Sequence, residues 1–187
     1  MKKYKKIKIN EISYASSRNE ILKKGYKNRT KVSLDWIKKA KIKKANYDIE
    51  GSTLYWHSGI WQSGTWGKYG IWEDGIWEDG IWENGFWEEG IWKKGIWKDG
   101  IWEKGIWKNG VWKDGTWKSG IWENGEWENG DWEKGIWKNG TWYKGSWKSG
   151  KWEKGNWIEG NIYDPKLKKF VFSKINPKEY FESKNNY

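Results

Sequence analysis

Few residues in this chain of 187 residues are of the types that carry out catalysis. The chain has no cysteine and a single histidine, His57. Cysteine nucleophiles and disulfide scaffolds are therefore excluded, and a zinc site would lack its usual ligands. Adjacent carboxylates such as Glu88 and Glu89 have the composition of a general acid and base pair, but charged residues recur along this region as periodic surface charge. We expect a protein that is not an enzyme and that holds no metal, no cofactor and no small-molecule substrate.

The elements that position these side chains follow from a five-residue repeat, Gly-x-Trp-x-x, exemplified by residues 75–79. Tryptophan falls at every fifth position from Trp72 to Trp157. Trp56, Trp61 and Trp66 belong to the same series, with one extra residue before Trp72. A last unit, residues 161–165, has isoleucine in place of tryptophan and proline in place of glycine. We interpret it as the terminating cap that repeat arrays need.

The period of five indicates short strands rather than helices. A glycine in every unit would cost a helix about 1 kcal/mol per unit, whereas β-branched and aromatic residues favour extended chain. The residue before the glycine is Asn, Asp or Ser in 13 of the 21 tryptophan-bearing units. These residues assist tight turns, and glycine supplies the positive φ that such turns require. Each unit is therefore predicted to be a very short strand followed by a turn.

Two all-β architectures fit such units. In one, the chain winds as a β-solenoid of five-residue faces, with four units and about 20 residues per coil, by analogy with stacked repeat arrays. In the other, three-residue strands pair in an antiparallel meander that is coiled into a ribbon. A buried tryptophan contributes about 4–6 kcal/mol, and ordering a five-residue unit costs about 7 kcal/mol. Because the tryptophans must then be almost completely buried, the closed solenoid is favoured. At the position after tryptophan, charges that lie four units apart give six opposite and six like pairs, so they do not distinguish the solenoid from the meander.

Gly75 and Trp77 lie two positions apart, as do the corresponding residues of every unit. This spacing resembles the pentapeptide-repeat family, in which a small and a large residue point into a quadrilateral coil. The same motif is similar to half of a MORN repeat, which supports the antiparallel alternative. The array also resembles Gly-x-Trp/Phe arrays in tailed-phage proteins, and that resemblance implies a virus-encoded structural protein.

Charge and pattern divide the chain into three parts. Residues 1–50, with a net charge of +11, form a basic head for which we expect a mixed α/β structure, including a helix from Ser33 to about Lys44 with Ser33 as N-cap. Residues 51–160 are the repeat array, with a net charge of −3. Residues 161–187 form a C-terminal cap, with a strand at 170–172, and a polar tail.

Two groups of outward-facing residues are candidate interaction sites. The residue before each tryptophan points away from it, and in one part of the array this position is apolar throughout, which is typical of a surface that meets a partner. The candidate partner-binding residues are Ile71, Ile76, Ile81, Phe86, Ile91, Ile96, Ile101, Ile106 and Val111. A candidate acidic patch consists of Glu73, Asp74, Glu78, Asp79, Glu83, Glu88 and Glu89.

These features predict a structural or protein–protein interaction module that acts in assembly or in binding a host protein. The expected partner is another protein or a second copy of the chain, and the basic head is a possible nucleic-acid site. The alternative, which the resemblance to the pentapeptide-repeat family implies, is a regulatory binder that acts on nucleic acid, or on an enzyme of nucleic acid, by partial mimicry. We expect no membrane partner, because no apolar run is long enough to span a bilayer, and a location in the cytoplasm, or in the virion for a viral protein.

Overall fold

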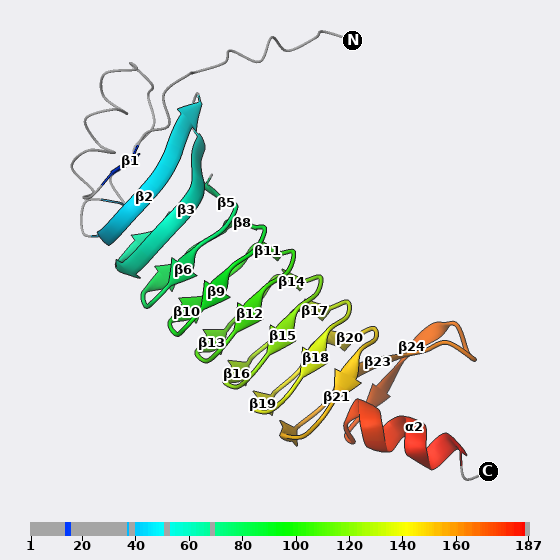
Figure 1. Cartoon of the computed structure of the whole chain (residues 1–187). Helices are drawn as coiled ribbons and strands as arrows, with labels where there is room; N and C mark the ends of the chain where they lie inside the picture. Colours follow the sequence, from blue (N-terminus) through cyan, green and yellow to red (C-terminus); the bar gives the residue numbers. More distant parts are fainter. Residues whose placement is uncertain (1–13, 16–36, 38–39, 51–52, 68–69, 186–187) are drawn as a thin grey trace, which may run out of the picture.

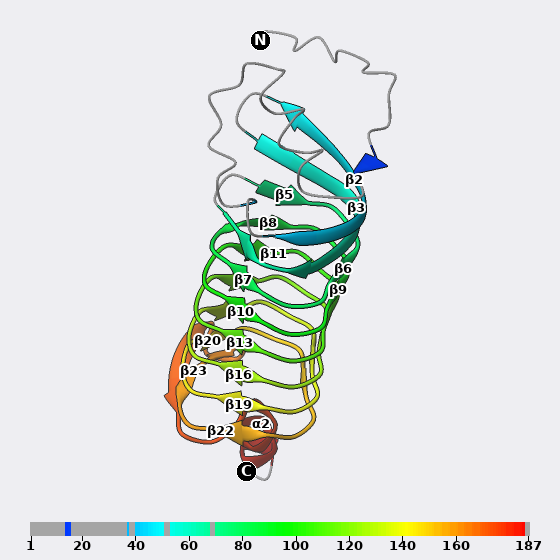
Figure 2. The same ribbon diagram turned by 90° about the vertical axis from the view of Figure 1, so that its left-hand side faces the viewer.

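A computed structural model describes residues 14–15, 37, 40–50, 53–67 and 70–185 of the chain. The repeat array winds as a β-solenoid (Figure 1), and Figure 2 shows its coils stacked along one axis. Each short strand pairs in parallel with the strands three units before and after it, so that Ile96 lies between Ile81 and Val111. One coil therefore contains three units. The predicted solenoid is confirmed, whereas the coil of four units and the antiparallel meander are wrong.

The solenoid has three faces, each a ladder of parallel strands. Face 1 contains β5 (Gly70–Trp72), β8 (Gly85–Trp87), β11 (Ile101–Trp102), β14 (Thr116–Trp117), β17 (Asp131–Trp132), β20 (Ser146–Trp147) and β23 (Gly160–Asp164). Face 2 contains β6 (Ile76–Trp77), β9 (Ile91–Trp92), β12 (Ile106–Trp107), β15 (Ile121–Trp122), β18 (Ile136–Trp137) and β21 (Lys151–Trp152). Face 3 contains β4 (Thr65–Trp66), β7 (Ile81–Trp82), β10 (Ile96–Trp97), β13 (Val111–Trp112), β16 (Glu126–Trp127), β19 (Thr141–Trp142) and β22 (Asn156–Trp157).

The coil is three-sided because three indoles fill its interior. Trp56, Trp61 and Trp66 meet each other edge to face, with ring centroids 5.5–6.3 Å apart. This edge-to-face contact of three indoles agrees with the close packing of protein interiors. Along the axis each indole from Trp56 to Trp142 stacks on the corresponding indole of the next coil, as Trp92 does on Trp107 at 4.7 Å. The core is thus three columns of stacked tryptophans.

Within the described part of the chain, many buried indole N–H groups have no hydrogen-bond acceptor. Trp102 Nε1 donates to the Ser119 carbonyl at 3.2 Å, but Trp92 and Trp107 have no hydrogen-bond partner among the described residues. Each such buried donor costs about 1–3 kcal/mol. The columns are stable because every unit also buries a whole indole and gains its stacking energy.

The glycines form the corners, as predicted. Gly105 has φ +133°, and a Cβ atom at this position would lie 2.5 Å from the carbonyl oxygen of Gly90 on the preceding coil. That carbonyl accepts a hydrogen bond from the backbone N–H of Ile106 at 3.0 Å. Only glycine allows this close passage of one turn over another.

The N-terminal end of the solenoid is covered by antiparallel strands. β2 (Lys41–Glu50) pairs with β3 (Thr53–Ser63), and β1 (Tyr14–Ala15) pairs with β2. Residues 41–44 were expected in a helix and lie in β2, so that part of the prediction is wrong. Pairing with β3 overrides the local helical pattern here, because it supplies the backbone hydrogen bonds. The rest of the expected helix, except Ile37 and Ala40, and its N-cap Ser33 lie outside the described residues.

The C-terminal end is closed by a hairpin and a helix. Ile162 takes the place of tryptophan, is fully buried, and pairs with Trp147, as expected of a cap. The predicted strand at 170–172 is confirmed as β24 (Lys169–Ser173), which is antiparallel to β23. The expected polar tail instead forms α2 (Pro177–Asn185). The Asn176 side chain accepts a hydrogen bond from the Glu179 backbone N–H at 3.0 Å and so caps this helix.

Candidate interaction surface

The three-sided coil distributes the nine predicted partner-binding residues over three faces. Residues adjacent in the repeat, such as Ile76 and Ile81, lie on different faces, and only residues in every third unit share one. Each face therefore receives three of the nine. Face 1 has Ile71, Phe86 and Ile101; face 2 has Ile76, Ile91 and Ile106; face 3 has Ile81, Ile96 and Val111.

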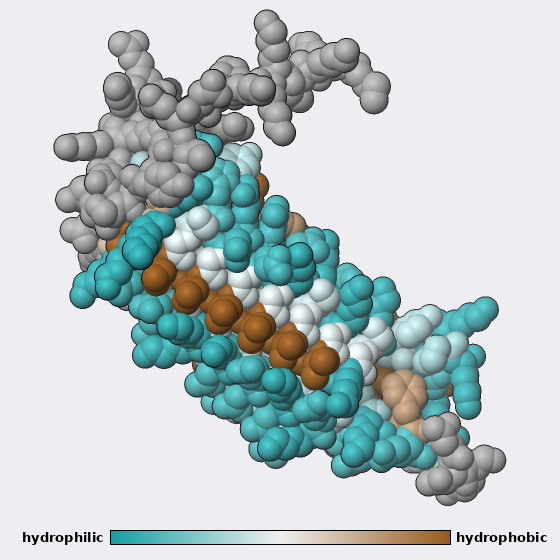
Figure 3. Space-filling model, in the orientation of Figure 1, coloured by the Kyte–Doolittle hydropathy of each residue, from teal (hydrophilic) through white to brown (hydrophobic). Residues whose placement is uncertain are grey.

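Face 2 alone continues the apolar row. Six isoleucines are stacked in register on it, and Figure 3 shows a continuous line of apolar side chains across the surface. We call this row the isoleucine ladder; its members are Ile60, Ile76, Ile91, Ile106, Ile121 and Ile136. All six are partly exposed.

The other two faces turn polar over the same coils. On face 1 the outward position is threonine at Thr116, aspartate at Asp131 and serine at Ser146. On face 3 it is Glu126 and then Thr141. The backbone of the three faces is the same, so isoleucine is not needed to form these strands.

The sequence alone contained a signal for this arrangement. Sequence reasoning missed Ile60, Ile121 and Ile136, because it followed the outward residues in chain order. At the position after tryptophan, charges that lie three units apart give nine opposite and four like pairs. That imbalance indicates a coil of three units. When the outward residues of every third unit are then grouped together, one group consists of the six isoleucines of the ladder.

The predicted acidic patch is divided among the three corners of the solenoid. Glu73, Asp74, Glu88 and Glu89 follow face 1, Glu78 and Asp79 follow face 2, and Glu83 follows face 3. Lysines one coil later neutralise much of it. The ion pairs are Glu78–Lys93 at 3.3 Å, Asp79–Lys94 at 3.1 Å, Glu83–Lys98 at 3.0 Å and Glu89–Lys104 at 2.8 Å.

The single histidine lies at the N-terminal end, between two carboxylates. His57 Nδ1 is 2.6 Å from Glu73 and Nε2 is 3.3 Å from Asp48. Burial lowers the pKa of His57, but the hydrogen bonds and negative charges of Glu73 and Asp48 outweigh it and raise the pKa above 6.5. The His57 side chain thus joins β2, β3 and the corner after β5, and we assign it a structural role.

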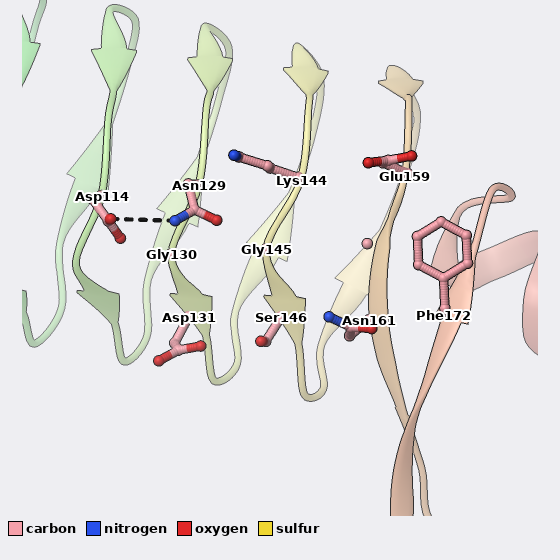
Figure 4. A pocket seen from close by; sticks show the side chains of 11 residues that line it. Asp114, Asn129, Gly130, Asp131, Lys144, Gly145, Ser146, Glu159, Asn161 and Phe172 are labelled. Carbon is pink, nitrogen blue, oxygen red and sulfur yellow. Dashed lines mark hydrogen bonds between the residues drawn. The ribbon is translucent and has the colours of Figure 1, made fainter.

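A polar groove of about 370 Å³ lies towards the C-terminal end of face 1. Figure 4 shows Asp131, Ser146 and Asn161 on successive coils and the Asn129 amide donating to Asp114. Neither histidine nor cysteine lines the groove, so Ser146 has no activating imidazole there. Among the described residues, no group of three or more His, Cys, Asp or Glu side chains is arranged to hold a metal ion.

The regular five-residue spacing of tryptophan in a solenoid is consistent with a pentapeptide-repeat-like array, but with three sides per coil. The chain was compared with protein-family models, with curated proteins and with solved structures, and none of the three comparisons gave a match. Within the described part of the chain, no helix is both long and apolar enough to cross a membrane.

Proposed function

We propose that this protein is a non-enzymatic interaction module whose solenoid presents the isoleucine ladder to a protein. The observation that carries the proposal is the contrast between faces in the later coils. Ile121 and Ile136 remain on face 2, where the same position on the other faces is Glu126 or Asp131. Partly exposed apolar side chains lined up on one face are typical of an interaction surface.

The burial of the tryptophans supports a protein ligand rather than a glycan or a nucleic acid. Indoles that stack on sugars or bases must be exposed, and those from Trp56 to Trp147 are at most 1% exposed. The paired charges also weigh against mimicry of nucleic acid, because Lys93, Lys94 and Lys98 offset the carboxylates one coil earlier. A viral origin stays a prediction that rests on the resemblance alone.

The proposal is tested by affinity capture of proteins from a lysate, with two variants that carry the same kind of substitution on different faces of the solenoid. The full chain, carrying an affinity tag, is expressed in its source cells, and a nuclease-treated lysate is analysed by mass spectrometry. In the test variant, Ile121→Asp and Ile136→Asp interrupt the ladder. In the control, Ile96→Asp and Val111→Asp place the same charges on face 3. Asp131 occupies the corresponding position on face 1, so both variants are expected to fold.

The expected result is a stoichiometric protein that is retained by the wild type and the control and lost from the ladder variant. Equal capture by all three proteins, or recovery of nucleic acid alone when nuclease is omitted, would contradict the proposal. Circular dichroism of each variant checks that the solenoid is intact.

A further inference from the structure

We propose that the ladder binds the ladder of a second copy of this chain, with the two solenoids antiparallel and Ile106 at the centre of the contact. The inference rests on the proposed function and names its partner. A row of identical β-branched side chains at regular spacing is self-complementary, as in the dry interfaces between paired sheets. Two such faces would pack about 10 Å apart.

The charges beside the ladder define the register. Each isoleucine has one charged or polar residue two positions before it and one two positions after it. From the first complete coil onward, the preceding row is Asp74, Glu89, Lys104, Ser119 and Lys134. The following row is Glu78, Lys93, Lys108, Glu123 and Lys138.

In an antiparallel pair, each row meets the same row of the second copy in reverse order. With Ile106 at the centre, Ile76 meets Ile136 and Ile91 meets Ile121. The charges that then face each other are Asp74 with Lys134, Glu78 with Lys138, and Lys93 with Glu123. At the centre, Lys104 faces Lys104 of the second copy, and Lys108 faces Lys108 of the second copy. All five isoleucine rows from Ile76 to Ile136 are matched in this register.

Other registers are less favourable in their charges, although one of them, shifted by one coil towards Ile60, would place all six isoleucines of the ladder opposite one another. A shift by one coil in either direction places Lys93 opposite another lysine, Lys108 or Lys138, and Glu78 opposite another glutamate, Glu123 or Glu153. In a parallel pair, the row before the ladder meets the row after it on the same coil. Asp74 then faces Glu78, and Lys134 faces Lys138. Like charges in direct opposition oppose association, so the charges favour the antiparallel pair.

The area of the ladder predicts a reversible dimer. Five rows spaced by about 4.8 Å, and a width of four residues at about 3.3 Å each, give a footprint on the order of 300 Å² per copy. Stable dimers bury about 800 Å² per partner. Association should therefore depend on protein concentration and reach completion only in concentrated solution.

Sedimentation velocity of the full chain over a concentration series, extended to the millimolar range, tests the association. The wild type is expected to convert from monomer to dimer. Ile106→Asp buries two carboxylates at the centre of the contact and should weaken the association about tenfold or more. Ile101→Asp, on the same coil but on face 1, should leave it unchanged. A monomer at every concentration, or equal weakening by both variants, would overturn the proposal.

Single cysteines test the antiparallel register, because the chain has none of its own. A thiol crosslinker that spans about 10 Å, the spacing of packed sheets, should join two copies of the Ile106→Cys variant. It should not join two copies of Ile76→Cys, which lie four coils apart, but should join Ile76→Cys to Ile136→Cys. Crosslinking of Ile76→Cys to itself would contradict the antiparallel arrangement.

Failure of the self-association is distinguishable from failure of the proposed function. If the wild type stays monomeric and the ladder variant still loses a captured protein, the second copy is excluded as the partner and the interaction surface stands. If Ile106→Asp associates as the wild type does, and the variant with Ile121→Asp and Ile136→Asp still retains every captured protein, both proposals fail.

Discussion

Trp97 lies parallel to Trp112, with ring centroids 4.8 Å apart and an angle of 6° between the ring planes. The two residues are separated by one complete coil, and Ile96 pairs in register with Val111 beside them. This relationship repeats along the solenoid, so the register of the core also fixes the register of the surface. Changes to core, corner, cap and surface should therefore have separable effects.

Gly105→Ala should destabilise the solenoid by roughly 2–4 kcal/mol, because alanine is strained at positive φ and its methyl group overlaps the turn below. The added Cβ atom would lie only 2.5 Å from the Gly90 carbonyl oxygen. Chemical denaturation followed by tryptophan fluorescence measures the free energy of unfolding. Asn109→Ala, one residue before the next corner glycine, is the matched control and should have a much smaller effect.

Trp102→Phe should destabilise the protein more than Trp107→Phe, by about 1–3 kcal/mol. Both indoles are fully buried, so the two substitutions lose similar volume. The first also removes the hydrogen bond to the Ser119 carbonyl. The second removes a buried N–H that has no acceptor among the described residues. Equal free energies of unfolding for the two variants would show that the indole hydrogen bond contributes nothing.

Asp164 should make the C-terminal cap sensitive to acid. Lys184, the backbone N–H groups of Leu167 and Lys166, and the Tyr180 hydroxyl lower its pKa from 3.8 to about 2. Because the folded pKa lies below the unfolded value, this stabilisation is present above about pH 4 and is lost as the pH falls towards 2. Melting temperatures of wild type and Asp164→Asn between neutral and acid pH measure the effect.

The Asp164→Asn variant should be less stable at neutral pH and should approach the wild type as the pH falls to about 2 and below, where the carboxylate becomes protonated. Asp131→Asn, which alters an exposed carboxylate on face 1, should follow the wild type throughout. A constant difference between wild type and Asp164→Asn at all pH values would contradict the prediction.

His57 should stabilise the N-terminal end at low pH. Its folded pKa is raised above 6.5, so its contribution is fully present below that pH and is lost as the pH rises through the folded pKa. As the only histidine of the chain, it gives a single set of imidazole signals in an NMR titration. Glu73→Gln should lower the measured pKa; an unchanged pKa would exclude Glu73 as a cause of the shift.

The repeat by itself determined the local structure and the direction of the side chains. Gly-Ile-Trp fixes a corner, an outward residue and an inward residue within three positions, because positive φ and β-branching act locally. The burial that the tryptophans require then favoured the solenoid over the antiparallel meander, and Ile162 in place of tryptophan indicated the cap. The tertiary structure corrected the helix over residues 41–44 and the C-terminal tail, where pairing with β3 and the cap Asn176 determine the conformation.

The number of faces, and with it the composition of the surface, depends on packing between units, and in the sequence only the spacing of opposite charges three units apart reflects it. All units have the same local pattern, so nothing within a single unit distinguishes three sides from four. The choice depends on how many indoles fill a coil, and three do so edge to face, as Trp56, Trp61 and Trp66 illustrate. That packing brings Ile121 above Ile106 and separates Ile76 from Ile81, because neighbours on a face come from successive coils and not from successive units of the chain.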